Sequence, residues 1–472
     1  MIGLLSVVLE AVRLALRGVA ALAAVRFAWQ ALRALRAEEV TAPPWVGPAP
    51  EVLVQLPVRD EEAVIERLLW AVCALDHPRA SLCIQVVDSS RPAARAQTAA
   101  LVEAARGEGA PVELLEREQP AGFKAGSLAL GLTRSAAEYV AVFDADALPP
   151  PDFLARALPA FADPGVAYVQ ARWSFPGRDT SLLTRLQALV LDSLFLTAHP
   201  PGEASGFHGS GGILRRASLD AVGGWRPEAL AEDLDLTVRL ALAGWRGVQL
   251  RDLVVPCELP ADMGAFRRQQ RRWAFGAGQA LRAHGRAVLG ARLPLVRRAA
   301  LLARLGRHAL YPLLLINGLA VPFTTLCHVH TPLFYGVGVN LGLLAAVLGT
   351  LLLRVLVAEV HAGGRPRDAL LTPALVPLVL GLTPTYTVAF LGGLLGARLP
   401  FERTPKGGLS EAGGLSWLVP VELCLALGFA AAAVLAVERG ILLYGAFLAC
   451  FSGGVAWVAV GSLRTAWRRG RG

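Results

Sequence analysis

Short apolar runs alternate with helical patterns through the first half of the chain. Each run is followed by polar or turn residues, and the runs lie at 52–56, 82–87, 112–115 and 139–143. Segments with helical periodicity separate them, at 62–75, 97–106 and 124–135. Short buried strands that alternate with helices are typical of a mostly parallel sheet covered on both faces. The pattern therefore predicts an α/β domain over residues 51–258.

Longer apolar runs dominate the second half of the chain. Four of them are predicted to cross a bilayer, at 311–326, 334–353, 417–437 and 441–463. Another apolar segment, 370–397, contains several prolines and has basic residues on both sides, which favours a re-entrant or interfacial segment. We therefore predict interfacial helices at 259–307, a transmembrane region at 308–463 and a basic cytoplasmic tail at 464–472.

The first 36 residues are apolar but are interrupted by Glu10, Arg13 and Arg17. Both a membrane-spanning helix and an amphipathic interfacial helix fit this pattern. The proline-containing stretch at 37–50 is predicted to be a linker. One crossing before the α/β domain and four after it place that domain and the C-terminal tail in the cytoplasm of a multi-pass protein of the cell (inner) membrane.

Composition supports a membrane protein rather than an ordinary soluble enzyme. The hydrophobic fraction is 54% and the formal net charge is +9. Arginines beside apolar runs are expected to mark cytoplasmic loops and to contact anionic membrane lipids, so we predict no nucleic-acid partner. The six cysteines form no CxxC pair, which indicates neither a zinc site nor a disulfide framework.

Carboxylates follow the ends of the predicted strands. Asp60, Asp88, Asp144 and Asp146 all lie just past strand ends, where ligands bind in such sheets. Asp144 and Asp146 could coordinate a hard divalent cation and, through it, a diphosphate. A solvated turn is the alternative for this pair. Asp88 could reach a nucleotide, or could serve as a helix cap.

A second acidic pair, Glu232-Asp233, precedes an amphipathic helical run. A carboxylate here could deprotonate an incoming hydroxyl. Asp233 could equally cap the helix, and the two roles could coexist. The glycine-rich segment at 206–212 could allow the backbone to approach a sugar closely, or could be a plain loop.

A basic stretch, Arg267-Arg-Gln-Gln-Arg-Arg-Trp273, stands between the α/β domain and the apolar half. By itself it indicates a basic cluster beside a membrane. On an interfacial helix, Arg267, Arg268 and Arg271 are expected to face lipid headgroups. The other set, Gln269, Arg272 and Trp273, is expected to face the cleft.

These motifs in this order resemble the membrane-embedded inverting glycosyltransferases of family 2, which include cellulose, hyaluronan and glucomannan synthases. The resemblance covers about residues 52–273 and a loop at 401–407. Its parts are Leu56-Pro-Val-Arg-Asp-Glu61, Asp88, Phe123-Lys124-Ala-Gly126, Asp144-Ala-Asp146, Gln170-Ala-Arg-Trp173, Ser181-Leu-Leu-Thr-Arg185, 207–215, Glu232-Asp233, Gln269-Gln-Arg-Arg272-Trp273 and Phe401-Glu-Arg-Thr-Pro-Lys406-Gly407. The departures include Ala231 for Thr, His208 for Asn and Arg403 for Val, which leave the identity of donor and acceptor open.

The resemblance implies a GT-A-like fold, the nucleotide-diphospho-sugar transferase fold, inserted in an α-helical transmembrane region. It makes Asp233 the catalytic base and implies that Asp144 and Asp146 bind Mg²⁺ or Mn²⁺. The implied donor-binding residues are Asp60, Glu61, Asp88, Lys124, Asp144, Asp146 and Lys406, the last in a gating-like loop at 399–409. The implied acceptor-binding residues are Glu232, Gln269, Arg272, Trp273 and Trp173.

The implied reaction moves a hexose from UDP-glucose or GDP-mannose to the end of a growing β-linked polysaccharide, processively and with membrane translocation. The alternative is a single transfer to a membrane lipid, as in ceramide-glucosyltransferase-like relatives. A transporter or scaffold with an inactive domain is a third hypothesis. The expected partners are the nucleotide sugar, a polysaccharide or lipid acceptor, membrane lipids and an envelope export partner.

Overall fold

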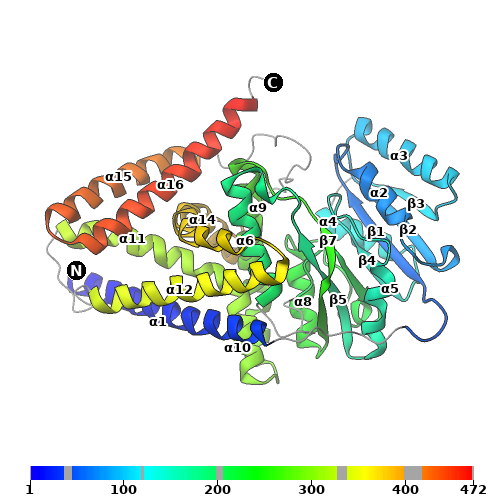
Figure 1. Ribbon diagram of the computed structural model, residues 1–472, viewed down its shortest axis with the longest axis horizontal. Helices are drawn as coiled ribbons and strands as arrows, with labels where there is room; N and C mark the ends of the chain where they lie inside the picture. The colour runs from blue at the N-terminus through cyan, green and yellow to red at the C-terminus, as the bar shows by residue number, and fades with distance from the viewer. Residues whose placement is uncertain are drawn as a thin grey trace.

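The computed structural model describes residues 2–36, 45–118, 122–197, 206–326, 337–397 and 417–469. It has an α/β part and a helical part that lie side by side (Figure 1). The α/β part runs from β1 to β7, whereas the helical part combines α1 at the start of the chain with α9 to α16. The predicted loop at 399–409, with Lys406, and most of the predicted linker lie outside the described residues.

A seven-stranded sheet with the order β3-β2-β1-β4-β6-β5-β7 forms the centre of the α/β part. Its strands are β1 (Val52–Val58), β2 (Leu82–Asp88), β3 (Val112–Glu116), β4 (Tyr139–Val142), β5 (Val166–Ser174), β6 (Gly212–Arg215) and β7 (Arg246–Pro256). Strand β6 is antiparallel to both β4 and β5, and the other pairs are parallel. The predicted mostly parallel sheet is therefore confirmed.

The two faces of the sheet bury different residues of the same strand. In β1, Val52, Val54 and Leu56 join one core with residues of α2 (Ile65–Cys73) and α3 (Pro92–Gly107). Leu53 points the other way, into a second core with α4 (Phe123–Leu132) and α8 (Glu232–Leu242). Successive side chains on a strand point to opposite faces, so an uninterrupted apolar run serves a sheet covered on both sides.

Further helices complete the α/β part. These are α5 (Phe153–Ala157), α6 (Leu182–Thr197) and α7 (Arg216–Ala221). Helix α6 packs against α12 (Val337–Ala362), and Arg178, just before α6, forms an ion pair of 2.8 Å with the fully buried Glu359 of α12. This contact joins the α/β part to a helix of the apolar half.

The helical part has three helices long and apolar enough to cross a membrane, or up to five spans if each bent pair is one, among the described residues. The three lie in α12, α15 (Leu418–Glu438) and α16 (Leu442–Arg469). One bent pair joins α10 (Leu295–Leu305) to α11 (Leu310–Leu326) at 55°. The other joins residues 366–381, which include α13 (Leu375–Gly381), to α14 (Thr383–Leu395) at 53°. The protein is therefore a membrane protein, and a re-entrant segment at 370–397 remains a prediction.

The first helix, α1 (Ile2–Leu35), lies along α12 (Figure 1). Its charged residues include Arg13, which is buried and lies 3.9 Å from Glu10. Arg17 donates a hydrogen bond of 2.9 Å to Asn340 of α12. Contacts of this kind allow charged side chains on an apolar helix. A membrane-spanning or an interfacial position of α1 therefore stays a prediction.

Helix α9 (Met263–Gly290) carries the Arg267–Trp273 stretch and packs closely on α14. A Cβ atom at Gly278 would lie 2.2 Å from the carbonyl oxygen of Phe390, and one at Gly393 would lie 2.1 Å from that of Phe275. Small residues let helix backbones approach at such an interface. The stretch is thereby held against the bent segment that ends in α14.

The structure corrects the expectation that Arg267 faces lipid headgroups. Its side chain is only 5% exposed, and its guanidinium donates a 2.7 Å hydrogen bond to Glu422 of α15, which is fully buried. It also donates to Thr385 of α14 at 2.9 Å. The sequence could not reveal the partner because Glu422 lies more than 150 residues away, on another helix. Arg267 is thus a structural link between α9, α14 and α15.

This buried ion pair makes a prediction about stability. Glu422→Leu leaves the Arg267 guanidinium without its counter-charge and is expected to destabilise the fold by about 3–5 kcal/mol. The double variant Arg267→Leu/Glu422→Leu removes both charges and is expected to recover much of this loss. Thermal unfolding in lipid nanodiscs measures both. A double variant no more stable than Glu422→Leu would contradict the importance of the pair.

Candidate active site

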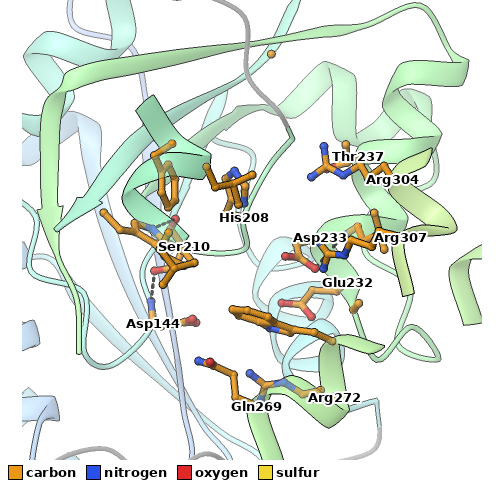
Figure 2. Close-up of a pocket in the computed structure, with 18 of the residues that line it drawn as sticks. Asp144, His208, Ser210, Glu232, Asp233, Thr237, Gln269, Arg272, Arg304 and Arg307 are labelled. Carbon is orange, nitrogen blue, oxygen red and sulfur yellow. Dashed lines mark hydrogen bonds between the residues drawn. The ribbon is translucent and has the colours of Figure 1, made fainter. Parts of the chain in front are cut away.

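A cavity of about 980 Å³ lies where the α/β part meets the helices. Its lining includes most of the predicted site residues: Glu61, Lys124, Asp144, Asp146, Trp173, Glu232, Asp233, Gln269, Arg272 and Trp273. Figure 2 shows Asp144 on one side, Glu232 and Asp233 opposite it, and Gln269 and Arg272 along another wall. The fold therefore brings residues from four separate parts of the chain to one space.

The Asp144-Ala145-Asp146 turn follows β4 directly. The Asp144 backbone N–H donates a 2.9 Å hydrogen bond to the Ser210 hydroxyl, and its side chain is 41% exposed. Asp146 is only 4% exposed, and its carboxylate accepts a 3.0 Å hydrogen bond from the backbone of Glu258. The Asp146 carboxylate is therefore fixed by the backbone, while the Asp144 carboxylate is the more exposed of the two in the cavity lining.

Lys124, in the first turn of α4, connects the two acidic pairs. Its Nζ lies 2.7 Å from Asp144 Oδ1 and 3.2 Å from Glu232 Oε1, and it donates a 2.8 Å hydrogen bond to the Gly209 carbonyl. Burial by itself lowers the pKa of Lys124, but the carboxylates of Asp144 and Glu232 outweigh it, so the net pKa is raised. Lys124 is thus a fixed positive charge at the acidic side of the cavity.

Glu232 and Asp233 form the first turn of α8. The residue at the helix N-cap is Ala231, so Asp233 is not the capping residue that the sequence pattern allowed. Burial raises the pKa of Glu232, against the opposing effect of Lys124. The half-buried Asp233 accepts a 2.7 Å hydrogen bond from the Leu234 backbone. A carboxylate facing a cavity in this way is a candidate general base.

The Asp144 and Asp146 carboxylates fit a divalent cation that a diphosphate also binds. Carboxylate oxygens suit Mg²⁺ and Mn²⁺, and a cationic group, Lys124 Nζ, already lies on Asp144. Within the described residues no cluster of three or more His, Cys, Asp or Glu side chains could hold a metal. Such an ion would therefore take its other ligands from the diphosphate and water, as Mg²⁺ commonly does.

Asp60 and Asp88 lie at the ends of β1 and β2 but do not line the cavity. Ser90 joins them: its hydroxyl accepts a 2.7 Å hydrogen bond from the Asp60 N–H, and its own N–H donates 2.7 Å to Asp88 Oδ1. Asp88 is fully buried, and its Oδ2 has no hydrogen-bond partner among the described residues. An unmet acceptor of this kind is costly, so a donor group on a ligand would stabilise it.

Helix α9 presents different faces of its Gln-Gln-Arg-Arg-Trp motif to different neighbours. Gln269, Arg272 and Trp273 line the cavity. Gln270 points elsewhere: its side-chain oxygen accepts a 2.8 Å hydrogen bond from the Tyr386 hydroxyl of α14. The predicted acceptor residues Gln269, Arg272 and Trp273 therefore lie at the cavity, and the neighbouring Gln270 is held against α14.

Trp173 lines the cavity and supports the glycine-rich segment. Its indole N–H donates a 3.1 Å hydrogen bond to the Ser210 carbonyl, and its ring lies 5.9 Å from that of His208. The backbone at Gly209 and Gly211 has positive φ, which glycine adopts without strain. This conformation turns the segment toward Asp144 and Lys124.

Two arginines that the sequence did not indicate also line the cavity. Arg304 lies in the last turn of α10, and Arg307 lies just beyond that helix. Figure 2 shows Arg307 beside Asp233 and Arg304 beside Thr237. Arg304 lies against Gly206, where a Cβ atom would be 2.2 Å from its guanidinium. Both arginines belong to a stretch of mixed basic and apolar residues that resembles an ordinary membrane-proximal segment. Their position in the cavity can therefore be seen only in the folded chain.

Comparison with known proteins gives the class of this fold. The structure is similar to that of mannosyltransferase PcManGT from Pyrobaculum calidifontis in complex with GDP-Man and Mn²⁺, with a TM-score of 0.54 and 24% sequence identity. The similarity covers 83% of this chain and 100% of that one. The α/β part therefore has the GT-A type of glycosyltransferase fold, as the motifs predicted.

Sequence comparison then gives the family. The "Glycosyl transferase family 2" model matches residues 54–223, and the "Glycosyl transferase family group 2" model matches residues 139–360. Both models describe family 2 glycosyltransferases, and together they span residues 54–360. This confirms the resemblance seen in its motifs.

The relatives include glucomannan 4-beta-mannosyltransferases of plants. Glucomannan 4-beta-mannosyltransferase 2 of Arabidopsis thaliana is 40% identical over 242 residues, which is 49% of this chain and 45% of that protein. Probable glucomannan 4-beta-mannosyltransferase 7 of Oryza sativa subsp. japonica is 36% identical over 266 residues, 54% and 45% of the two chains. The similarity thus spans about half the length of these relatives.

Proposed function

We propose that the chain is an inverting hexosyltransferase that moves a hexose from a nucleotide diphosphate sugar to an acceptor hydroxyl. The observation that carries this proposal is the shared cavity, lined by Asp144 and Asp146 from the sheet, Asp233 from α8 and Trp273 from α9. A carboxylate pair for a cation-bound diphosphate, a carboxylate base and an aromatic surface for a sugar are the parts that such a transfer needs.

In the proposed reaction Asp233 accepts the proton of the acceptor hydroxyl. The hydroxyl oxygen bonds to the anomeric carbon while the bond from that carbon to the diphosphate breaks, and the nucleoside diphosphate leaves with the electron pair. A single displacement inverts the configuration, so an α-linked donor gives a β-linked product. Positioning of the hydroxyl between Asp233 and the donor supplies a large share of the rate.

The donor is proposed to lie at the acidic side of the cavity. A divalent cation bound by Asp144 and Asp146 would neutralise charge on the diphosphate. Lys124, 2.7 Å from Asp144, would be within reach of the same phosphates. Glu61 lines this side, and Asp60 and Asp88 would serve the nucleotide from just behind it. Lys406 is proposed to close over the donor from the loop at 399–409.

The acceptor is proposed to lie along α9. Gln269, Arg272 and Trp273 would hold the terminal sugar, with Glu232 and Trp173 completing its site. The names of the plant relatives support a β-linked polysaccharide as product. We propose that elongation is processive and that the product crosses the membrane through the helical part. The enzyme would lie in the cell membrane with its active site facing the cytoplasm, and an envelope export partner would receive the product. A single transfer to a lipid is the alternative.

A panel of nucleotide sugars tests the proposal. Purified protein in nanodiscs is incubated with GDP-mannose, UDP-glucose and other common donors, and nucleoside diphosphate release is measured. We expect GDP-mannose or UDP-glucose to be used, and the relatives' names favour mannose. A labelled product of high mass that a β-glycosidase degrades supports elongation, whereas a single-sugar product soluble in chloroform supports the alternative. Release from no donor would refute the proposed activity.

The acceptor assignment makes its own prediction. Trp273→Ala removes the aromatic surface from the cavity wall and is expected to lower kcat/KM by about thirtyfold, the effect of losing about 2 kcal/mol of binding. Trp70→Ala is the matched control, because Trp70 is 38% exposed on α2 and does not line the cavity. Initial rates over a range of acceptor concentrations measure both. Equal activity of the two variants would remove Trp273 from the acceptor site.

A further inference from the structure

The two walls of the cavity have opposite charge. Among the described residues, every carboxylate in its lining comes from the α/β part: Glu61, Asp144, Asp146, Glu232, Asp233 and Glu258. The described lining residues of the helical part include no carboxylate and six guanidinium groups, those of Arg26, Arg272, Arg297, Arg304, Arg307 and Arg354. The acidic wall suits a cation-bound diphosphate, so the basic wall calls for a second ligand.

Much of this positive charge is not neutralised within the described part of the chain. Arg26, Arg297, Arg304 and Arg307 form no ion pair within 4.0 Å with any carboxylate that the structure describes. Arg354 is held by neutral partners, at 2.8 Å from the Thr197 hydroxyl and 3.1 Å from the Ser193 carbonyl. Guanidinium groups gathered in a cavity with no carboxylate at ion-pair distance favour an anionic ligand.

Apolar side chains stand between these arginines. Val19, Ala23 and Phe27 line the cavity from α1, and Ala300 and Leu301 line it from α10. The Arg354 guanidinium lies 5.0 Å above the Phe27 ring. Helix α1 packs along α12, which contains a candidate membrane span, so this wall continues into the membrane part. A neutral polysaccharide offers neither a charge for the arginines nor a chain for the apolar residues.

We propose that the basic wall binds a phosphate-bearing amphiphile, with its phosphate between Arg304 and Arg307 and its alkyl chain along α1 and α10. Planar guanidinium groups bind phosphate through paired hydrogen bonds, and the apolar residues match the chain. Arg307 lies beside Asp233 (Figure 2), so a hydroxyl on the same headgroup reaches the base. The inference rests on the proposed function and deepens it: an anionic lipid with a hydroxylated headgroup is the first acceptor.

The transfer step is the one already described, with the lipid as nucleophile. The headgroup hydroxyl oxygen bonds to the anomeric carbon, its proton passes to Asp233, and the nucleoside diphosphate leaves. The lipid phosphate keeps all its bonds and serves only to hold the headgroup. Later sugars would be added to the hexose so attached.

Binding of four short-chain probes tests the site without depending on activity. Calorimetric titrations of the full chain in nanodiscs use dihexanoyl phosphatidylglycerol, dihexanoyl phosphatidylcholine, dihexanoylglycerol and glycerol 3-phosphate. We expect phosphatidylglycerol to bind at least about tenfold more tightly than each of the others, because it alone combines net negative charge, hydroxyls and alkyl chains. Equal binding of the two phospholipids, or equal binding of glycerol 3-phosphate, which would show a free-phosphate site, overturns the proposal.

Variants then place the site. The double variant Arg304→Gln/Arg307→Gln is expected to lose the tenfold preference for phosphatidylglycerol over the other probes. The control variant Arg286→Gln is expected to keep it, because Arg286 is an exposed residue of α9 outside the cavity lining. If the double variant weakens binding of nucleoside diphosphate with Mn²⁺ as strongly as it weakens binding of phosphatidylglycerol, the two arginines belong to the donor site and the proposal fails. Sugar transfer to an oligosaccharide by a protein that shows no lipid preference would refute this inference alone. Absence of transfer from every nucleotide sugar would refute the proposed function, whatever the lipid result.

Discussion

Asp233→Asn is expected to lower kcat by a factor of about 10²–10⁴, the contribution of a positioned general base. The amide keeps the size of the side chain and can still accept the hydrogen bond from the Leu234 backbone, so α8 should begin unchanged. It cannot accept the proton of the acceptor hydroxyl. Binding of the nucleoside diphosphate is expected to stay near its original strength, because Asp144, a proposed ligand of the cation that holds the diphosphate, lies on the opposite side of the cavity (Figure 2).

The matched control is Asp220→Asn, on α7. Asp220 is exposed and pairs at 3.0 Å with Arg216, a surface ion pair of little energetic weight. Single-turnover rates and calorimetric nucleotide binding are measured for both variants. If the single-turnover rate of Asp233→Asn equals that of Asp220→Asn, Asp233 is not the base. Such a result would favour the hypothesis of a scaffold with an inactive domain.

Asp146→Asn is expected to remove the metal-dependent part of nucleotide binding. Loss of an outer partner of a metal ligand costs about 10–100-fold in affinity, so loss of the ligand itself should cost at least about 100-fold. The amide oxygen can still accept the hydrogen bond from the Glu258 backbone, which protects the turn. Calorimetry with nucleoside diphosphate, with and without Mn²⁺, gives a result that does not depend on turnover.

Asp152→Asn serves as the control, since Asp152 is 55% exposed and lies only 3.5 Å from the surface residue Arg156. Thorough chelation with EDTA should abolish transfer by the unaltered protein, and Mg²⁺ or Mn²⁺ should restore it. Nucleotide binding by Asp146→Asn that still increases with Mn²⁺ would exclude Asp146 as a ligand. Full activity after chelation would exclude a metal from the reaction.

The first four strands could be predicted because each is a short apolar run with a polar end. The later strands lack this signal. Strand β7 (Arg246–Pro256) contains Arg251 and Asp252, and it pairs with β5 through register shifts. Strand β6 is only four residues long and antiparallel to its neighbours. Short strands whose partners are distant in sequence depend on tertiary contacts, which local periodicity does not contain.

The candidate site divides in the same way. Asp144, Asp146 and Asp233 could be proposed from motifs in which the residues are adjacent or nearly so. Arg304 and Arg307 could not, because their importance comes from the cavity that they enter, about 70 residues beyond Asp233 along the chain. Arg267 was placed wrongly because basic residues near apolar runs usually face lipid, and only the position of Glu422 shows otherwise.

The cavity draws its lining from α1 and from Arg354 of α12 as well as from the α/β part. During synthesis the α/β residues emerge before α10 and α12, so a nascent chain has its acidic wall before most of its basic wall. The site is then completed only when α12 is in place against α1 and α6. A chain whose helical part is not yet assembled would therefore lack the complete site.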